Sequence, residues 1–286
     1  MAGAARILVF DSGLGGLTVA RAIRRLAGDA VSLSYAADFA GFPYGDWEEQ
    51  ALRAHLLRLV GRLAARARAD VVVIACNTAS TLALDALRAA YPEVPFVGTV
   101  PAIKPAAKLS ESGIIGVLAT PGTVRREYTE KLIHTFAWHR RVVLHGAPRL
   151  AALAEEKLRS GTVNLSALRE EIAPVFVRGA HGARTDVVVL GCTHYPLLLP
   201  ELEQAAPWPV RFIDPSAAIA RQALRVAGLA REGTKAQGSA AETQVGGGAQ
   251  DERNGQAFIT GLAAGWTHQA LAGLFAREGF TMLQDA

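Results

Sequence analysis

The chain has 286 residues and a mass of 30.2 kDa, and half of its residues are hydrophobic, which is enough to fill one large or two small cores. Its net charge is +4, but 25 of the 30 basic residues are arginines scattered among acidic residues along predicted helix surfaces. The sequence contains no basic run, no basic patch interleaved with aromatic residues and no zinc pattern, so it does not support a nucleic-acid partner.

The longest apolar runs are far too short to span a bilayer, and the first ten residues lead directly into a strand pattern without a signal-peptide layout. We therefore expect a cytoplasmic protein with no membrane segment. The only two cysteines are Cys76 and Cys192. In a reducing cytosol we expect them to be free thiols rather than a disulfide.

Short apolar runs alternate with amphipathic helical stretches along the chain. The runs predict strands at residues 7–10, 33–37, 71–75, 95–99, 114–119, 142–145, 187–191, 210–214 and 258–261. The clearest helix is predicted to start at Asp46, with Glu49 completing a capping box, and to end near Arg68. A final helix is expected around residues 263–277. Alternation of this kind predicts an α/β fold with mainly parallel sheets.

A weak internal symmetry suggests two similar α/β halves. Each half opens with a strand and turn (VFDSGLGG, VLATPGT), and each later has a cysteine at a strand end (ACNT, GCTH). We predict a first domain of residues 1–98 plus 211–286 and a second of residues 99–210, related by a pseudo-twofold axis with the active site between them. Residues 231–254 lack periodicity and are predicted to be a flexible insertion.

Two motifs combine turn-forming residues with polar side chains. DSGLGG (11–16) follows the first strand, so Asp11 and Ser12 could cap the turn or, with the amides that follow, face an anion. In YAADFAGFPYGD (35–46), Pro43 and Gly45 indicate a turn that could present Tyr44. Asp38 is either a turn acceptor or a carboxylate that supports the site from behind.

The motifs CNTAS (76–80) and CTHYP (192–196) place a thiol at matching strand ends of the two halves. In a parallel sheet, ligands gather at the carboxyl ends of the strands. Each cysteine precedes a predicted helix whose N-terminal amides favour an anion, so we expect a modestly lowered thiol pKa that leaves a useful fraction as base at neutral pH. His194, two residues after Cys192, could tune that thiol or relay a proton.

In this order and at these intervals, DSGLGGLTV, the Tyr35…Asp38…PYG stretch, ACNTAS and GCTHYPLL resemble the motifs of the glutamate racemase family, within the aspartate/glutamate racemase superfamily. The resemblance covers roughly residues 6–228. It implies a cofactor-independent racemase that interconverts L- and D-glutamate and supplies D-glutamate for peptidoglycan. It also implies two α/β domains that enclose the substrate.

By the same resemblance, Cys76 would take the proton from D-glutamate and Cys192 from L-glutamate, assisted by Asp11 and His194 respectively. The family's glutamate partner of the histidine falls on Glu155, although the positions around it depart from the usual pattern. The residues that match substrate-binding positions are Ser12, Pro43, Tyr44, Gly45, Asn77, Thr78 and Thr193, with Thr120 and Thr123 as further candidates. TGLAAG (260–265) stands where a TGDP-like turn would be expected.

The sequence is also compatible with other functions. An aspartate racemase, or a related racemase of the superfamily, would use its two cysteines in the same way. A cysteine hydrolase would leave one of the thiols idle. A nucleic-acid-binding or regulatory protein would fit the high pI, but the sequence supports neither nucleic acid nor a gyrase-type secondary partner. We expect no cofactor, no metal, glutamate as the small-molecule partner, and a homodimer.

Overall fold

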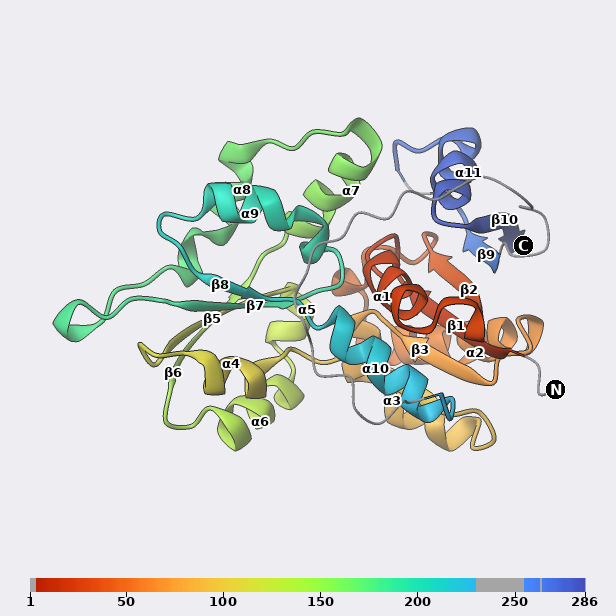
Figure 1. Cartoon of the computed structure of the whole chain (residues 1–286), viewed down its shortest axis with the longest axis horizontal. Coiled ribbons are helices and arrows are strands. Elements are labelled where there is room, and N and C mark those ends of the chain that lie inside the picture. Colours follow the sequence, from red (N-terminus) through yellow and green to blue (C-terminus); the bar gives the residue numbers. More distant parts are fainter. Residues whose placement is uncertain (1–3, 230–254, 263, 286) are drawn as a thin grey trace.

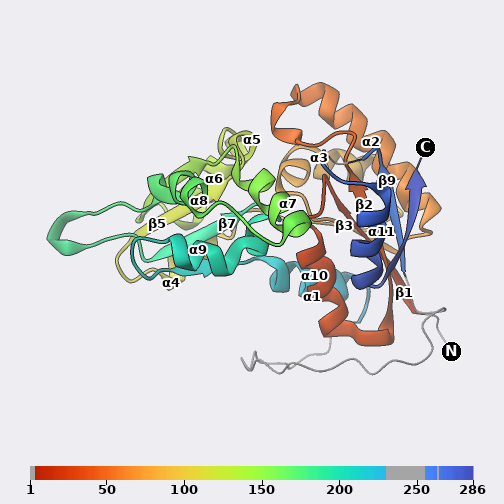
Figure 2. The ribbon, with the colours of Figure 1, turned by 90° about the horizontal axis from the view of Figure 1, so that it is seen from above.

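The computed structural model describes residues 4–229, 255–262 and 264–285. They form two sheets of parallel strands, flanked by helices, which lie side by side (Figures 1 and 2). All strand pairs within both sheets are parallel, as the alternation of elements predicts. The predicted insertion at residues 231–254 lies outside the described residues. In the described part of the chain, no helix is long and apolar enough to cross a membrane.

The first sheet has the strand order β10-β9-β2-β1-β3-β4. Its strands are β1 (Ala5–Asp11), β2 (Val31–Asp38), β3 (Val71–Ile74), β4 (Phe96–Gly98), β9 (Gly255–Thr260) and β10 (Phe280–Asp285). The apolar runs in β1 and β3 are buried on both sides, which is typical of central parallel strands.

Helices cover both faces of the first sheet. Its helices are α1 (Leu17–Ala27), α2 (Glu49–Arg66), α3 (Asn77–Ala90), α10 (Ser216–Val226) and α11 (His268–Arg277). Alternate residues of β1 point to opposite faces, so Ile7 and Val9 pack with α1, α10 and α11. Leu8 and Phe10 pack with α2 and α3. A short 3₁₀ helix, η1 (Gly28–Ala30), joins α1 to β2.

The second sheet has the order β6-β5-β7-β8, which repeats the β2-β1-β3-β4 order of the first. Its strands are β5 (Ile114–Ala119), β6 (Arg141–Gly146), β7 (Val187–Gly191) and β8 (Arg211–Ile213). The repeated order supports two similar halves, while the pseudo-twofold axis between them stays a prediction.

The second sheet also lies between two helical layers. Its helices are α4 (Ile103–Leu109), α5 (Pro121–Val124), α6 (Glu127–Phe136), α7 (Leu150–Ser160), α8 (Leu165–Ile172) and α9 (Leu199–Ala205), with 3₁₀ turns η3 (Ala173–Val175), η4 (Ala180–Gly182) and η5 (Tyr195–Leu198). The core on one face includes residues of α7, α8 and α9, and the core on the other includes residues of α4. Each half is therefore a three-layer unit.

The structure changes several predicted boundaries. The long helix begins at Glu49 rather than Asp46, because the Glu48 side chain accepts the capping hydrogen bond from the Ala51 N–H at 2.8 Å. Asp46 belongs instead to η2 (Tyr44–Asp46). Strand β8, predicted at residues 210–214, spans Arg211–Ile213 and pairs with β7. The last helix begins at His268, and the following strand β10 was not predicted.

Candidate active site

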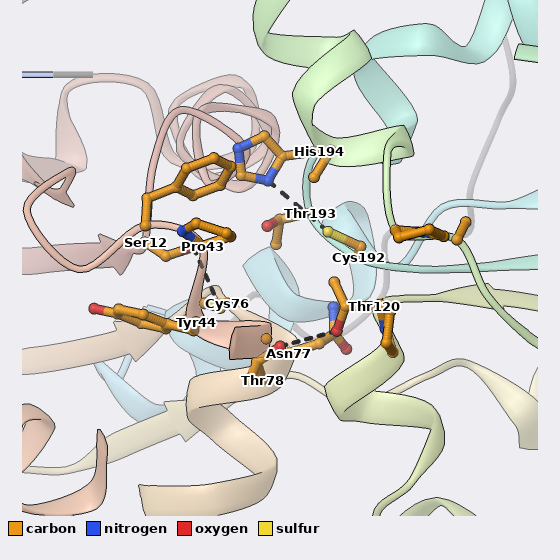
Figure 3. Close-up of a pocket in the computed structure, with 16 residues that line it drawn as sticks. Ser12, Pro43, Tyr44, Cys76, Asn77, Thr78, Thr120, Cys192, Thr193 and His194 are labelled. Carbon is orange, nitrogen blue, oxygen red and sulfur yellow. Dashed lines mark hydrogen bonds between the residues drawn. The ribbon is translucent and has the colours of Figure 1, made fainter. Parts of the chain in front are cut away.

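A cavity of about 100 Å³ lies where the carboxyl ends of the two sheets face each other. Its lining comes from both halves: Ser12, Phe42, Pro43, Tyr44, Gly45, Cys76, Asn77, Thr78, Thr120, Pro121, Ala147, Pro148, Ala151, Cys192, Thr193 and His194. In Figure 3, Cys76, Ser12 and Tyr44 lie on one side of the pocket, and Cys192 and Thr120 lie on the other. Both thiols are free, as expected from the sequence, and both are buried.

Cys76 stands between strand β3 and helix α3, where it is the residue preceding the first turn of the helix. Its sulfur lies 3.7 Å from Ser12 Oγ. Burial, with a further contribution from the negative charge of Asp11, raises the pKa of this thiol to about 12. A hydrogen bond from the Ala79 N–H acts in the opposite direction but is outweighed. The expectation of a lowered thiol pKa was therefore wrong for Cys76, because burial outweighs the helix terminus in the ligand-free site.

Cys192 follows strand β7 and has a histidine beside it. The Cys192 sulfur lies 3.8 Å from His194 Nδ1, and His194 Nε2 lies 2.9 Å from Glu155 Oε1. Burial lowers the pKa of His194, but the hydrogen bonds to Cys192 and Glu155 and the charge of Asp11 outweigh burial and raise this pKa well above its usual value. The imidazolium form is thus favoured next to this thiol.

Two carboxylates behind the pocket connect the halves of the molecule. Asp11 accepts hydrogen bonds from the Gly13 N–H at 2.9 Å and from the Thr193 hydroxyl at 2.8 Å. Burial raises the pKa of Asp11, against the opposing effects of His194 and these hydrogen bonds. Glu155 Oε1, from α7, accepts from the Leu14 N–H at 3.0 Å. Asp11 acts on the pKa of Cys76, whereas Glu155 is linked to Cys192 through His194, and neither carboxylate lines the cavity.

Polar groups of the cavity wall are available to hold an anion. The hydroxyls of Thr78, Thr120 and Thr123 lie within 3.3 Å of one another and join α3 to α5, with Thr123 outside the cavity lining. Both amide atoms of Asn77 are buried without a hydrogen-bond partner. A buried amide without partners is costly, so this side chain favours binding of a polar ligand in the cavity.

Tyr44 and Gly45 reach the cavity from η2, but the tyrosine hydroxyl is already used. It donates to Asp38 Oδ2 at 2.5 Å. Asp38 is fully buried and does not line the cavity. The sequence left its role open, and the structure makes it the acceptor that anchors Tyr44. Tyr44 can therefore offer its ring and backbone, rather than its hydroxyl, to a ligand.

Five lining residues were not predicted: Phe42, Pro121, Ala147, Pro148 and Ala151. Phe42 and Pro121 are neighbours of predicted site residues in the sequence, and this was the only signal that could have identified them. Ala147 and Pro148 lie between β6 and α7, Ala151 lies in the first turn of α7, and none of the three carries a group that would mark a site in the sequence. Among the described residues, no group of three or more His, Cys, Asp or Glu side chains could hold a metal ion.

Comparison with known proteins identifies the family. The family model for Asp/Glu/Hydantoin racemases matches residues 17–223. The chain is 56% identical over 216 residues to the glutamate racemase of Brucella anthropi, covering 76% of this chain and 77% of that protein. It is also 56% identical over 218 residues to the glutamate racemase of Mesorhizobium japonicum, covering 76% and 82%.

The chain belongs to the Asp/Glu/Hydantoin racemase family. Among solved structures of this racemase family, the glutamate racemase of Escherichia coli, in complex with L-glutamate and the activator UDP-MurNAc-Ala, has a TM-score of 0.82 and 38% identity. The match covers 98% of this chain and 97% of that chain. The glutamate racemase of Aquifex pyrophilus matches with a TM-score of 0.68 and 28% identity, covering 98% of both chains. The fold and the family expected from the motifs are both confirmed.

Proposed function

We propose that this racemase interconverts L- and D-glutamate without a cofactor, and that Cys76 and Cys192 exchange the α-proton on opposite faces of the substrate. The observation that carries the proposal is the position of the two free thiols, which reach one buried cavity from different halves of the molecule. Two bases on opposite faces allow one thiol to remove the proton while the other delivers one, so neither group has to cross the substrate plane.

The surroundings of the two thiols favour different protonation states in the ligand-free site. Cys76, with a pKa of about 12, holds its proton in the ligand-free site and is ready to donate it to the α-carbon. Cys192 lies beside a histidine whose imidazolium form is favoured and which would stabilise a thiolate. This pairing suits removal of the proton from L-glutamate by Cys192 and its replacement by Cys76. In the reverse direction the two roles exchange, with Asp11 and His194 as the assisting groups.

Substrate carboxylates would be held without lysine or arginine, since the cavity lining contains neither. The Asn77 amide, the hydroxyls of Thr78 and Thr120, and the first amides of α3 can supply the hydrogen bonds, while the Thr193 hydroxyl already donates to Asp11. The same donors would stabilise the negative charge that develops on the α-carboxylate when the α-proton leaves. The ammonium group of the bound substrate would also favour the Cys76 thiolate and offset the cost of ionising this buried thiol.

Glutamate is proposed over aspartate because the chain is 56% identical to proteins named glutamate racemase. The E. coli relative, in a structure that covers 98% of this chain, was crystallised with L-glutamate. We further propose that the D-glutamate produced supplies peptidoglycan synthesis. An aspartate racemase remains the second candidate, since its chemistry at the two thiols would be the same.

The test is to incubate the purified protein with L-glutamate, or in parallel with L-aspartate, without added cofactor and to follow optical rotation. We expect the glutamate signal to decay to zero, both with and without a chelator, and the aspartate signal to change little. Cys76→Ala and Cys192→Ala should each abolish the decay. A flat glutamate trace with folded protein would refute the proposal. Decay of the aspartate signal alone would indicate that aspartate, and not glutamate, is the substrate.

A further inference from the structure

The loop that brings Phe42, Pro43, Tyr44 and Gly45 to the cavity lies between β2 and α2, at residues 39–47. Two main-chain hydrogen bonds join it to the sheet, from the Ala40 N–H to the Thr260 carbonyl and from the Gly41 N–H to the Asp38 carbonyl. Its other main-chain hydrogen bonds, Phe42 N–H to Phe39 and Trp47 N–H to Tyr44, stay within the loop. The position of this cavity wall therefore depends on side-chain contacts beneath it.

These contacts converge on Asp38. One of its oxygens, Oδ2, accepts from the Tyr44 hydroxyl at 2.5 Å and lies 2.7 Å from His55 Nε2. The other, Oδ1, accepts from the Thr260 hydroxyl. Because the Asp38 side chain is fully buried, it depends on these three donors to offset the loss of water.

His55 comes from the second turn of α2 and contacts the loop on a second side. The centroid of its ring lies 5.1 Å from the centroid of the Trp47 ring, at an interplanar angle of 32°. Trp47 in turn donates its indole N–H to the Gly41 carbonyl at 2.8 Å. The imidazole thus bridges the carboxylate at the start of the loop and the indole at its end, yet it does not line the cavity.

We propose that His55 is a positioning residue, which acts through Asp38 and Trp47 to hold Tyr44 and Gly45 against the substrate. This role rests on the proposed glutamate racemisation, because the loop forms a wall of that pocket. Loss of the Nε2 hydrogen bond leaves Asp38 Oδ2 with only Tyr44 and frees the Trp47 ring, so the loop becomes mobile. His55 touches neither thiol, so substrate binding suffers more than the chemical step.

The test compares His55→Leu, which cannot donate a hydrogen bond, with His55→Gln, whose amide can occupy the place of Nε2. A hydrogen bond to a charged buried group makes a difference of roughly ten-fold or more in an equilibrium. We expect His55→Leu to raise the KM for glutamate by about ten-fold while kcat changes by less than about three-fold. His55→Gln should restore KM to within about three-fold of the original. Arg58→Leu, an exposed change on the same helix, serves as the matched control and should change neither constant.

Hydrogen exchange of the amides in residues 39–47 gives a second readout that needs no activity. Exchange should be faster in His55→Leu than in the unmodified protein, and close to normal in His55→Gln. If His55→Leu does not fold, His55→Asn provides the comparison, because its amide is too short to reach Asp38. Equal KM values and equal loop exchange in the Leu and Gln variants would overturn the positioning role. An unmodified protein that does not racemise glutamate would instead refute the proposed function, and loop exchange would still decide the role of His55.

Discussion

Asn77 and Cys76 are adjacent at the start of α3, and in the ligand-free cavity the Asn77 amide is unpaired while the Cys76 thiol keeps its proton. The amide has no hydrogen-bond partner, and burial raises the pKa of the thiol to about 12. The buried, unpaired amide weakens the folded state unless a substrate supplies its hydrogen bonds, and ionising the buried thiol needs a compensating positive charge. At the scale of single residues, the site is therefore arranged for the ligand-bound form.

The raised pKa of Cys76 predicts a specific dependence of stability on pH. Its ordinary value is 9.0, so between pH 9 and 12 the unfolded chain loses the thiol proton while the folded chain keeps it. Stability from this group is thus fully present below pH 9 and is lost as pH rises toward 12. Relative to Cys76→Ser, whose hydroxyl does not titrate, the unmodified protein should lose about 1 kcal/mol of unfolding free energy between pH 8 and 10. Urea unfolding of both proteins measures this difference, and a difference that is constant with pH would contradict it.

The turn between β1 and α1 shows how an element sets the geometry of the site. At Gly15, an added Cβ would lie 2.5 Å from His194 Nδ1 and 2.6 Å from Thr193 Oγ1. The absence of a side chain therefore lets the histidine of the second half approach the glycine-rich turn of the first half.

This close approach predicts the effect of Gly15→Ala. The methyl group would push His194 and Thr193 away from Cys192 and Asp11, and we expect racemisation to fall by roughly a hundred-fold, as for other misplacements of about 1 Å. Gly273→Ala, in α11, is the control, because its Cβ would meet only the Arg277 side chain at 3.7 Å. Alanine there should leave activity unchanged and add up to about 1 kcal/mol of stability. Activity of Gly15→Ala close to normal would show that the turn does not set the position of His194.

Elements were predictable where a local pattern determines them. The runs at 114–119 and 187–191 match β5 and β7 residue for residue, because uninterrupted apolar residues between turns favour buried strands. The start of α2 was misplaced because more than one acidic residue precedes the helix and only the folded backbone selects Glu48. Strand β10 was missed because its short segment mixes polar and apolar residues at the edge of the sheet.

The site was predictable only in part, because sequence motifs report neither burial nor contacts between distant residues. The motifs carry the pocket residues, and eleven of them do line the cavity: Ser12, Pro43, Tyr44, Gly45, Cys76, Asn77, Thr78, Thr120, Cys192, Thr193 and His194. The raised pKa of Cys76 depends on burial, which a sequence motif does not report. The contacts of Asp38 with His55 and with Thr260, which is 222 residues away, also exist only in the folded chain.

At the scale of the whole molecule, the proposed catalytic arrangement depends on how the two halves meet. Hydrogen bonds cross between them from Thr193 to Asp11, from the Leu14 N–H to Glu155, and between Thr78 and Thr120. On the α2 side, Arg126 forms an ion pair with Glu49. These contacts keep the two thiols on opposite sides of one cavity. The expected homodimer, the cytoplasmic location and the domain boundaries stay predictions.

The opposed thiols are tested most directly by racemising L-glutamate in deuterated water and analysing both enantiomers after the first turnovers. If Cys192 removes the proton and Cys76 delivers one exchanged with solvent, the D-glutamate formed should carry deuterium at the α-carbon. The recovered L-glutamate should stay mostly protiated, because return to the original face brings back the original proton. Equal deuterium in both enantiomers from the start would contradict the two-thiol arrangement and indicate a single mobile base.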